Sequence, residues 1–201
     1  MNIPPVVLVL LVVNGLLFAL GQSDPQALVT WLGLWPPGGD VSAFQPWQLL
    51  SYGFVHLGLL HLALNMYALW LFGTPLEHAL GTRRFLILYL GCVVGAALLH
   101  LLVQQLMMVQ GVPAAPVIGA SGGTFGVLMA FAYLYPDSRL YLLFPPMPVK
   151  AKWFVVGYGV IELLFGVTGT ANGIAHFAHL GGMLFGYLLL RYWRSHPPGY
   201  R

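Results

Sequence analysis

The chain has 201 residues, of which 59% are hydrophobic and only 6% are charged. Because a soluble globular domain carries roughly 25% charged residues, this composition excludes a water-exposed surface over most of the molecule. The net charge of +3 is small and dispersed, which argues against a nucleic-acid partner. The single cysteine, Cys92, cannot form an internal disulfide. We therefore expect a protein whose main solvent is the lipid bilayer.

Six apolar segments predict membrane-spanning helices, each of which needs about 20 mostly apolar residues. They are 4–21, 51–72, 84–107, 120–136, 150–168 and 174–193. Turn-rich stretches such as WPPGGD separate them, and no internal repeat or soluble domain stands out. The predicted fold class is an all-α polytopic membrane protein, with a single domain over residues 1–201.

The first segment is apolar enough to be mistaken for a signal peptide. It lacks the positively charged start that such peptides carry. We expect it to be retained as the first spanning helix.

The basic residues predict the orientation in the membrane. All eight lie on one side of a six-span arrangement: Arg83, Arg84, Arg139, Lys150, Lys152, Arg191, Arg194 and Arg201. Basic loops stay in the cytoplasm, so this side is predicted to be cytoplasmic, together with both termini. We expect a bacterial inner membrane as the location.

The loop at 21–50 carries three tryptophans, Trp31, Trp35 and Trp47, and no positive charge. Tryptophan prefers the headgroup level of a bilayer, so this loop is expected to lie half-sunk in the outer leaflet. Anchoring and the shaping of substrate access are both open as its role.

Polar groups inside spans are costly and usually functional. His61 and Asn65 in HLALN are four residues apart, so they share one helix face, where interhelical hydrogen bonds are the structural alternative. Ser121 in VIGASGGTFG stands among four glycines. If a helix begins near Gly119 or Ala120, Ser121 lies in its first turn beside unpaired N–H groups, and a helix cap or plain packing is the alternative.

A close helix contact is predicted by two pairs of glycines. Gly122 and Gly126 form a small-xxx-small pattern, and a second pair follows His179 in AHLGGMLFG. At 1.5 Å per residue, Ser121 lies roughly 22 Å and His179 roughly 18 Å from the cytoplasmic edge. The two side chains are therefore expected to meet at one depth.

His176 and His179 are three residues apart and raise the alternative of a metal site. The sequence contains no HExxH and places no acidic residue or cysteine near them as a further ligand. We expect no metal and no other cofactor. Glu162, inside the fifth segment, is expected to be a protonated or hydrogen-bonded packing residue.

Taken together, HLALN, GASG and AHLGGMLFG resemble the rhomboid family of intramembrane serine proteases, in the family order and over a matching six-span topology. The resemblance implies a dyad of Ser121 as nucleophile and His179 as general base, without an acidic third member. It also implies an oxyanion hole formed by His61, Asn65 and the Ser121 N–H. The substrates implied are transmembrane segments of other proteins, cleaved near the extracytoplasmic face.

Around this site we expect a water-filled cavity that opens to the outer side and is lined by His56, His61 and Asn65. Gly119, Gly122, Phe125 and Gly182 are expected to complete the lining of the active site. Two positions depart from the family pattern. Phe125 replaces a frequent tyrosine, and Trp47-Gln48 replaces a Trp-Arg pair, which weakens an expected link to Glu77.

Two other functions are compatible with the composition. A catalytically inactive rhomboid-like protein would bind membrane clients, but such relatives typically lack the serine or the histidine. A small transporter would use the buried histidines, and its polar residues would continue to the cytoplasmic side. The oligomeric state and the substrate are not specified by the sequence.

Overall fold

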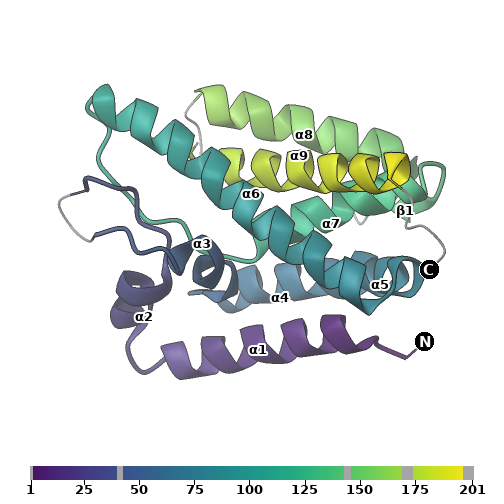
Figure 1. The fold of residues 1–201 in the computed structure, drawn as a ribbon, viewed down its shortest axis with the longest axis horizontal. Helices are drawn as coiled ribbons and strands as arrows, with labels where there is room; N and C mark the ends of the chain where they lie inside the picture. Colours follow the sequence, from purple (N-terminus) through teal and green to yellow (C-terminus); the bar gives the residue numbers. More distant parts are fainter. Residues whose placement is uncertain (1, 40–42, 143–145, 169–173, 197–201) are drawn as a thin grey trace.

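The computed structural model describes residues 2–39, 43–142, 146–168 and 174–196. Its elements in chain order are α1 (Pro5–Gly21), α2 (Pro25–Leu32), α3 (Gln48–Ser51), the 3₁₀ turn η1 (Tyr52–Phe54), α4 (Leu59–Ala68), the π-helical turn η2 (Leu69–Gly73), α5 (Thr74–Leu80), α6 (Thr82–Val109), α7 (Ser121–Leu134), β1 (Arg139–Tyr141), β2 (Pro148–Lys150), α8 (Ala151–Thr168) and α9 (Ile174–Ser195). Long helices run back and forth, with α1 along one side of the bundle and α8 along the other (Figure 1).

The helix content predicted from the sequence is confirmed, and the number of spans is confirmed in part. Among the described residues, three helices are long and apolar enough to cross a bilayer: Leu59–Leu80, Thr82–Val109 and Ala151–Thr168. The helices Pro5–Gly21 and Ser121–Leu134 are apolar but shorter. The count of six spans therefore stays a prediction.

The second predicted segment differs most from the structure. Its long helix begins at Leu59 rather than at 51, because Gly58 has extended backbone and the preceding residues form two short helical turns. The helix then continues through η2 and ends at Leu80. Gly73, the last residue of the π-helical turn, is closely packed. An added Cβ there would lie 3.1 Å from side-chain atoms of both Phe85 and Val7.

The short helix α2 and the pair of strands β1 and β2 were not predicted. Helix α2 begins where Asp24 caps it by accepting a hydrogen bond from the Ala27 N–H at 2.9 Å, and Pro25 takes the first position. The Asp-Pro pair was a local signal for this helix. Strands β1 and β2, which precede α8 in the chain, pair antiparallel, with Arg139 opposite Lys150.

Helices α6, α7 and α9 form the tightly packed centre of the bundle. A Cβ on Gly182 of α9 would overlap the carbonyl oxygen of Gly122 in α7, and one on Gly186 would lie 2.6 Å from the Gly126 oxygen. Backbone therefore touches backbone along this crossing. The close α7–α9 contact predicted from the glycine spacing is confirmed.

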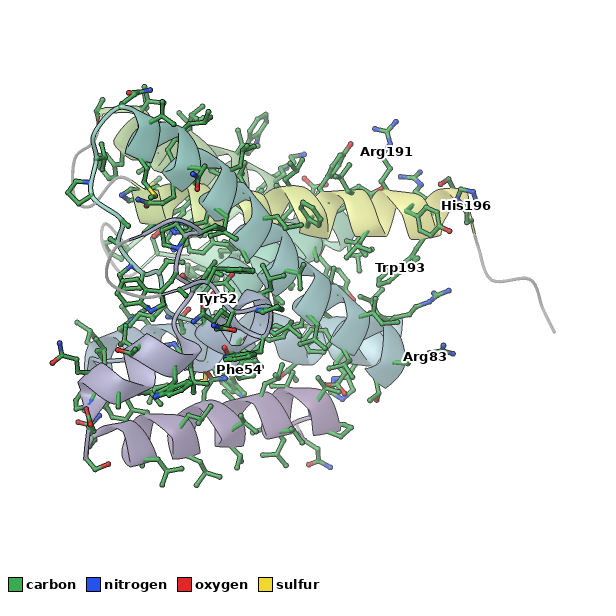
Figure 2. The ribbon with its side chains drawn as sticks, turned by 60° about the vertical axis from the view of Figure 1, so that its left-hand side comes forward. Tyr52, Phe54, Arg83, Arg191, Trp193 and His196 are labelled. Atoms are coloured by element: carbon green, nitrogen blue, oxygen red, sulfur yellow. The ribbon has the colours of Figure 1, made fainter. Side chains whose placement is uncertain are left out.

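Basic side chains gather at one end of the bundle. Arg83 at the start of α6 and Arg191 near the end of α9 lie at that end in Figure 2. The guanidinium of Arg84 lies 5.8 Å from the centre of the Trp193 ring, which joins the same two helix ends. Arg201 lies outside the described residues.

Glu77 binds the first helix. Its carboxylate accepts hydrogen bonds from the backbone N–H groups of Val6 at 3.0 Å and Val7 at 2.9 Å. These N–H groups are unpaired within α1, and the negative charge complements the positive end of the helix dipole. The carboxylate thus fixes α1 against α5.

Candidate active site

Ser121 is the first residue of α7, as the sequence predicted. Gly119 before it has a φ of +119°, and its N–H donates to the Tyr52 carbonyl at 2.9 Å. The Ala120 N–H donates to Nε2 of His56 at 3.3 Å. These two bonds hold the approach to the helix. The backbone N–H of Ser121 itself precedes the first intrahelical bond, which Thr124 makes to Ala120.

His179 lies against Ser121, although the two are 58 positions apart in the chain. Its Nε2 is 2.8 Å from Oγ of Ser121. The ring stacks on Phe125 with 4.2 Å between centroids and an angle of 1°. The predicted meeting of the two side chains at one depth is confirmed, and Phe125 stacks on the ring although it has no hydroxyl.

A cavity of about 360 Å³ opens beside this pair. Its lining residues are His61, Leu64, Asn65, Ala68, Phe72, Ser121, Thr124, Phe125, Leu128, Phe154, Tyr158 and His179. His61, Asn65, Ser121, Thr124 and His179 are joined by hydrogen bonds into one polar cluster. Leu128 lies seven residues beyond Ser121 on α7, roughly 10 Å along the helix axis. The cavity therefore has a polar end at Ser121 and an apolar end beside Leu128.

His61, Asn65 and Phe125 line the cavity as expected. The expected lining is corrected at four other residues, which are not among those that line it: His56, Gly119, Gly122 and Gly182. His56 is 1% exposed and is held by the Ala120 N–H. Gly122 and Gly182 face each other across the α7–α9 crossing, where no space is left.

His61 and Asn65 share one wall of the cavity with Ser121. A Cβ on Gly119 would lie 2.7 Å from Cε1 of His61, so the imidazole packs directly on the glycine. The Asn65 amide donates one N–H to the His61 carbonyl at 2.9 Å, which leaves its second N–H available.

Thr124 is a further polar residue of the site. Its hydroxyl lies 3.1 Å from Oδ1 of Asn65 and 3.1 Å from the Ser121 carbonyl. The His61 carbonyl can only accept, so the end of the Asn65 amide that faces it is the NH2 group, and the end that faces Thr124 is the oxygen. Thr124 therefore links α7 to Asn65 on α4.

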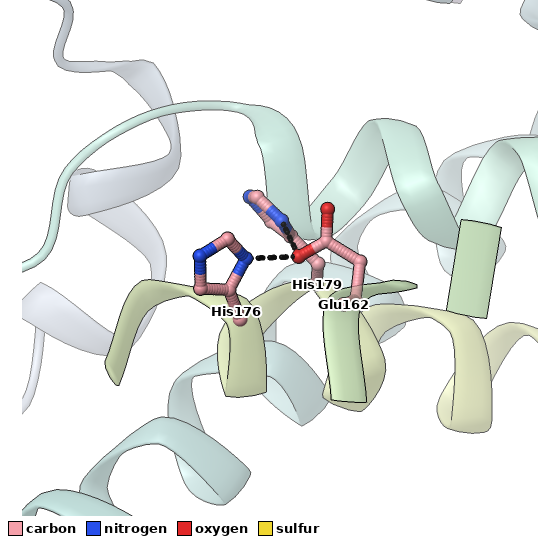
Figure 3. Close-up of side chains that lie close together, drawn as sticks. All are labelled: Glu162, His176 and His179. Carbon is pink, nitrogen blue, oxygen red and sulfur yellow. Dashed lines mark hydrogen bonds and ion pairs between the residues drawn. The ribbon is translucent and has the colours of Figure 1, made fainter. Parts of the chain in front are cut away.

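The structure places Glu162 against the pair of Ser121 and His179, a contact that the sequence did not predict. Its Oε2 lies 2.8 Å from Nδ1 of His179 and 2.5 Å from Nδ1 of His176 (Figure 3). Glu162 is hydrogen-bonded, as expected, but one of its partners is His179, the histidine that contacts Ser121. The one signal in the sequence was that Glu162 is the sole acidic residue of an apolar segment.

The same three side chains bring potential metal ligands together. One ligand atom from each lies within 4.8 Å of the others. The expectation of no metal rested on the lack of an acidic residue close to His176 and His179 in the sequence. In the folded protein an acidic residue does lie close to them. The fold supplies the carboxylate from α8.

A family model described as Rhomboid domain matches residues 43–195, which is more than half of the chain. The chain belongs to the rhomboid family. Its similarity to Rhomboid protein 1, mitochondrial, of Saccharomyces cerevisiae is 35% identity over 148 residues, covering 70% of this chain and 40% of the yeast protein. It is 29% identical over 197 residues to Rhomboid protease GlpG of Pectobacterium atrosepticum, covering 96% of this chain and 63% of that protein.

A third relative is Presenilin-associated rhomboid-like protein, mitochondrial, of Homo sapiens, at 32% identity over 161 residues. That match covers 75% of this chain and 40% of the human protein. The chain thus spans about two fifths of the length of the mitochondrial rhomboid relatives that it matches.

Gln48 stands where the rhomboid pattern has an arginine that was expected to pair with Glu77. In this structure Gln48 and Glu77 have separate partners. Buried Gln48 accepts hydrogen bonds from the N–H groups of Trp35 and Gln45 at 3.2 Å each, so it organises the first loop. Trp35 is buried within the protein, whereas Trp31 and Trp47 are exposed. A backbone bridge between Leu34 and Val117 ties this loop to the segment before Ser121.

Proposed function

We propose that this rhomboid is an intramembrane serine endopeptidase that cleaves transmembrane segments of other proteins. The observation that carries the proposal is the 2.8 Å contact between Ser121 Oγ and His179 Nε2 at the polar end of the cavity. A nucleophile and a base within hydrogen-bond reach, beside free backbone donors, are the arrangement that acyl transfer requires.

In the proposed reaction, His179 takes the proton from Ser121 as Oγ attacks the carbonyl carbon of the scissile peptide. The Ser121 N–H, His61 and the second N–H of Asn65 donate to the developing oxyanion. His179 then protonates the leaving amine, which breaks the peptide bond and leaves an acyl group on Ser121. Water deprotonated by His179 releases that acyl group, and the serine is restored.

The shape of the cavity supports the substrate class. Its walls come from α4, α7 and α8, and its apolar end accepts a hydrophobic side chain while the backbone reaches Ser121. A peptide bond inside an intact helix is shielded, so the substrate segment must unwind near this point. Small or helix-breaking residues close to the cleavage site are therefore favoured.

The orientation is part of the same proposal. The basic end of the bundle faces the cytoplasm, which puts Ser121 towards the extracytoplasmic face and both termini in the cytoplasm. A bacterial inner membrane is the proposed location. The single membrane domain over residues 1–201 is proposed to be sufficient for catalysis.

The test is cleavage of a labelled transmembrane substrate in liposomes. We expect Ser121→Ala and His179→Ala each to lose at least about 10³-fold in rate. The controls Ser195→Ala and His78→Ala change the same residue types on exposed helix ends and are expected to cleave normally.

Two further readouts decide between the candidate functions. A serine-directed fluorophosphonate is expected to label Ser121, and chelators are expected to leave cleavage unchanged. Cleavage that survives Ser121→Ala, or labelling of another serine, would end the proposal. A client that co-purifies intact with the wild type would instead favour an inactive client-binding protein.

A further inference from the structure

We propose that Glu162 is a positioning residue for His179, so that Ser121, His179 and Glu162 act as one hydrogen-bonded line. The inference rests on the proposed function, and it adds an acidic member where the resemblance implied none. The line runs from Oγ of Ser121 to Nε2 of His179 at 2.8 Å, and from Nδ1 of that ring to Oε2 of Glu162 at 2.8 Å.

The carboxylate decides which nitrogen of His179 carries the proton. A neutral imidazole has one N–H and one lone pair, and an ionised carboxylate only accepts hydrogen bonds. Nδ1 facing Glu162 must therefore be the N–H. The lone pair is left on Nε2, where it faces the Ser121 hydroxyl and can accept its proton. The negative charge also stabilises the imidazolium that forms during attack.

The surroundings of Glu162 argue against a packing role alone. Glu162 is 5% exposed, whereas its neighbours Ile161 and Leu163 are 46% and 48% exposed on the outer side of α8. A carboxylate in an apolar helix is costly and is tolerated when it faces the interior with partners. Here the described partners of its bonded oxygen are two ring nitrogens on the neighbouring helix.

His176 supports this arrangement from the other side. Its Nδ1 lies at 2.5 Å from the same Oε2, and its ring packs at 5.6 Å from Phe165. Its Nε2 is buried and has no hydrogen-bond partner among the described residues. The polar contact that the structure gives His176 is therefore with Glu162, which it holds in place.

The charged and titratable groups that face His179 are few. Glu162 and Tyr158 come from α8, His61 from α4, Ser121 from α7 and His176 from α9 itself. Glu162 is the one acid among these. It is therefore the group that can hold the imidazolium charge.

Metal binding is the competing use of the same atoms. A neutral imidazole bound to a metal through Nδ1 carries its proton on Nε2, so it cannot accept a proton from Ser121. Occupation by a metal and the proposed role of His179 thus exclude each other. A serine protease using this pair needs the cluster free of metal.

The experiment compares Glu162→Gln with wild type for substrate cleavage, with Glu77→Gln as the matched buried-carboxylate control. Glutamine keeps the shape of the side chain but removes the charge. We expect kcat to fall about 10²-fold or more with KM within about twofold. Glu162→Asp, which keeps the charge, is expected to retain more activity than Glu162→Gln.

A second readout does not depend on turnover. In ¹⁵N-histidine NMR of the wild type, His179 is expected to carry its proton on Nδ1, and this signal is expected to change in Glu162→Gln. A wild type with the proton on Nε2 would overturn the inference even if cleavage is normal. Loss of serine-dependent cleavage with the Nδ1 proton present would instead overturn the proposed function.

Three outcomes of the cleavage assay contradict the role of Glu162. The first is wild-type kcat in Glu162→Gln. The second is equal losses in Glu162→Gln and the Glu77→Gln control, which would indicate a general effect on folding. The third is activity abolished by chelators and restored by Zn²⁺, which would make the cluster a metal site.

Discussion

The two contacts that α9 makes with α7 and α8 are built in opposite ways. Against α7, glycines bring the backbones together, so that an added methyl on Gly182 has no free space. Against α8, the space beside glycines is filled by side chains: Gly159 faces the flexible end of Met183, and Gly166 faces the ring of Phe177. The first contact is rigid, and the second is adjustable.

His179 lies between these two contacts and takes something different from each. The glycine crossing sets how close α9 comes to α7, and thereby the distance from His179 to Ser121. The direction of the ring is set by Glu162, which lies on α8, and by the stack on Phe125, which lies on α7. Distance is thus fixed by backbone packing, and orientation by side chains.

The largest effect is expected from Gly182→Ala, which breaks the rigid contact. The new methyl meets the Gly122 carbonyl, and neither backbone can move without separating the helices. We expect unfolding to become easier by about 3 kcal/mol and cleavage to fall below detection. Thermal unfolding in detergent and the liposome assay measure both. Gly157→Ala in α8, where nothing lies within 4 Å, is the control and is expected to behave as wild type.

The next effect, on activity rather than stability, is expected from Gly119→Ala. The φ of +119° disfavours any side chain, and the methyl would displace the His61 ring at 2.7 Å. We expect a loss of about 10²-fold in kcat, the scale of one oxyanion-hole donor. Gly111→Ala has a φ of +87° but open space, so it carries the backbone strain alone. Equal losses in both variants would show that strain, rather than His61, accounts for the effect.

A smaller effect is expected from Gly159→Ala, which tests the adjustable contact. The methyl lies 3.2 Å from Cε of Met183, and an unbranched methionine can change rotamer. We expect stability within about 0.5 kcal/mol of wild type and cleavage within about twofold. A loss as large as that of Gly182→Ala would remove the distinction between the two faces of α9.

The smallest effect is expected at Asp137, just before the β1–β2 hairpin. Hydrogen bonds from Lys152 and Lys150 hold the pKa of Asp137 below its usual value. A lowered pKa in the folded protein stabilises it fully above the unfolded value of about 4, and this contribution is lost as the pH falls through the lowered folded-state pKa. Asp137→Asn is therefore expected to lower the unfolding temperature slightly at pH 7, and the difference is expected to shrink as the pH falls below about 4. Salt is expected to reduce the difference, because the carboxylate is exposed.

The main parts of the site could be predicted because their signals are local. Ser121 at a helix start follows from the glycines before and after it, and the α7–α9 contact follows from glycines four residues apart. The start of the second long helix at Leu59 was missed, since the apolar composition of 51–58 hides its non-helical backbone. The burial of Trp35 was not predicted, because the Gln48 amide that binds its backbone N–H lies 13 residues away in the chain.

The sequence by itself determined a helical membrane protein with a serine and a histidine brought to one level, because hydrophobicity, helix starts and small-residue spacing are properties of short stretches. Only the tertiary structure decided what lies behind that histidine. Whether Glu162 faces His179 depends on how α8 is rotated and shifted along α9, and no local pattern encodes that register. Tertiary packing likewise decided that Glu77 binds the start of α1 and that His56 binds the Ala120 N–H outside the lining of the cavity.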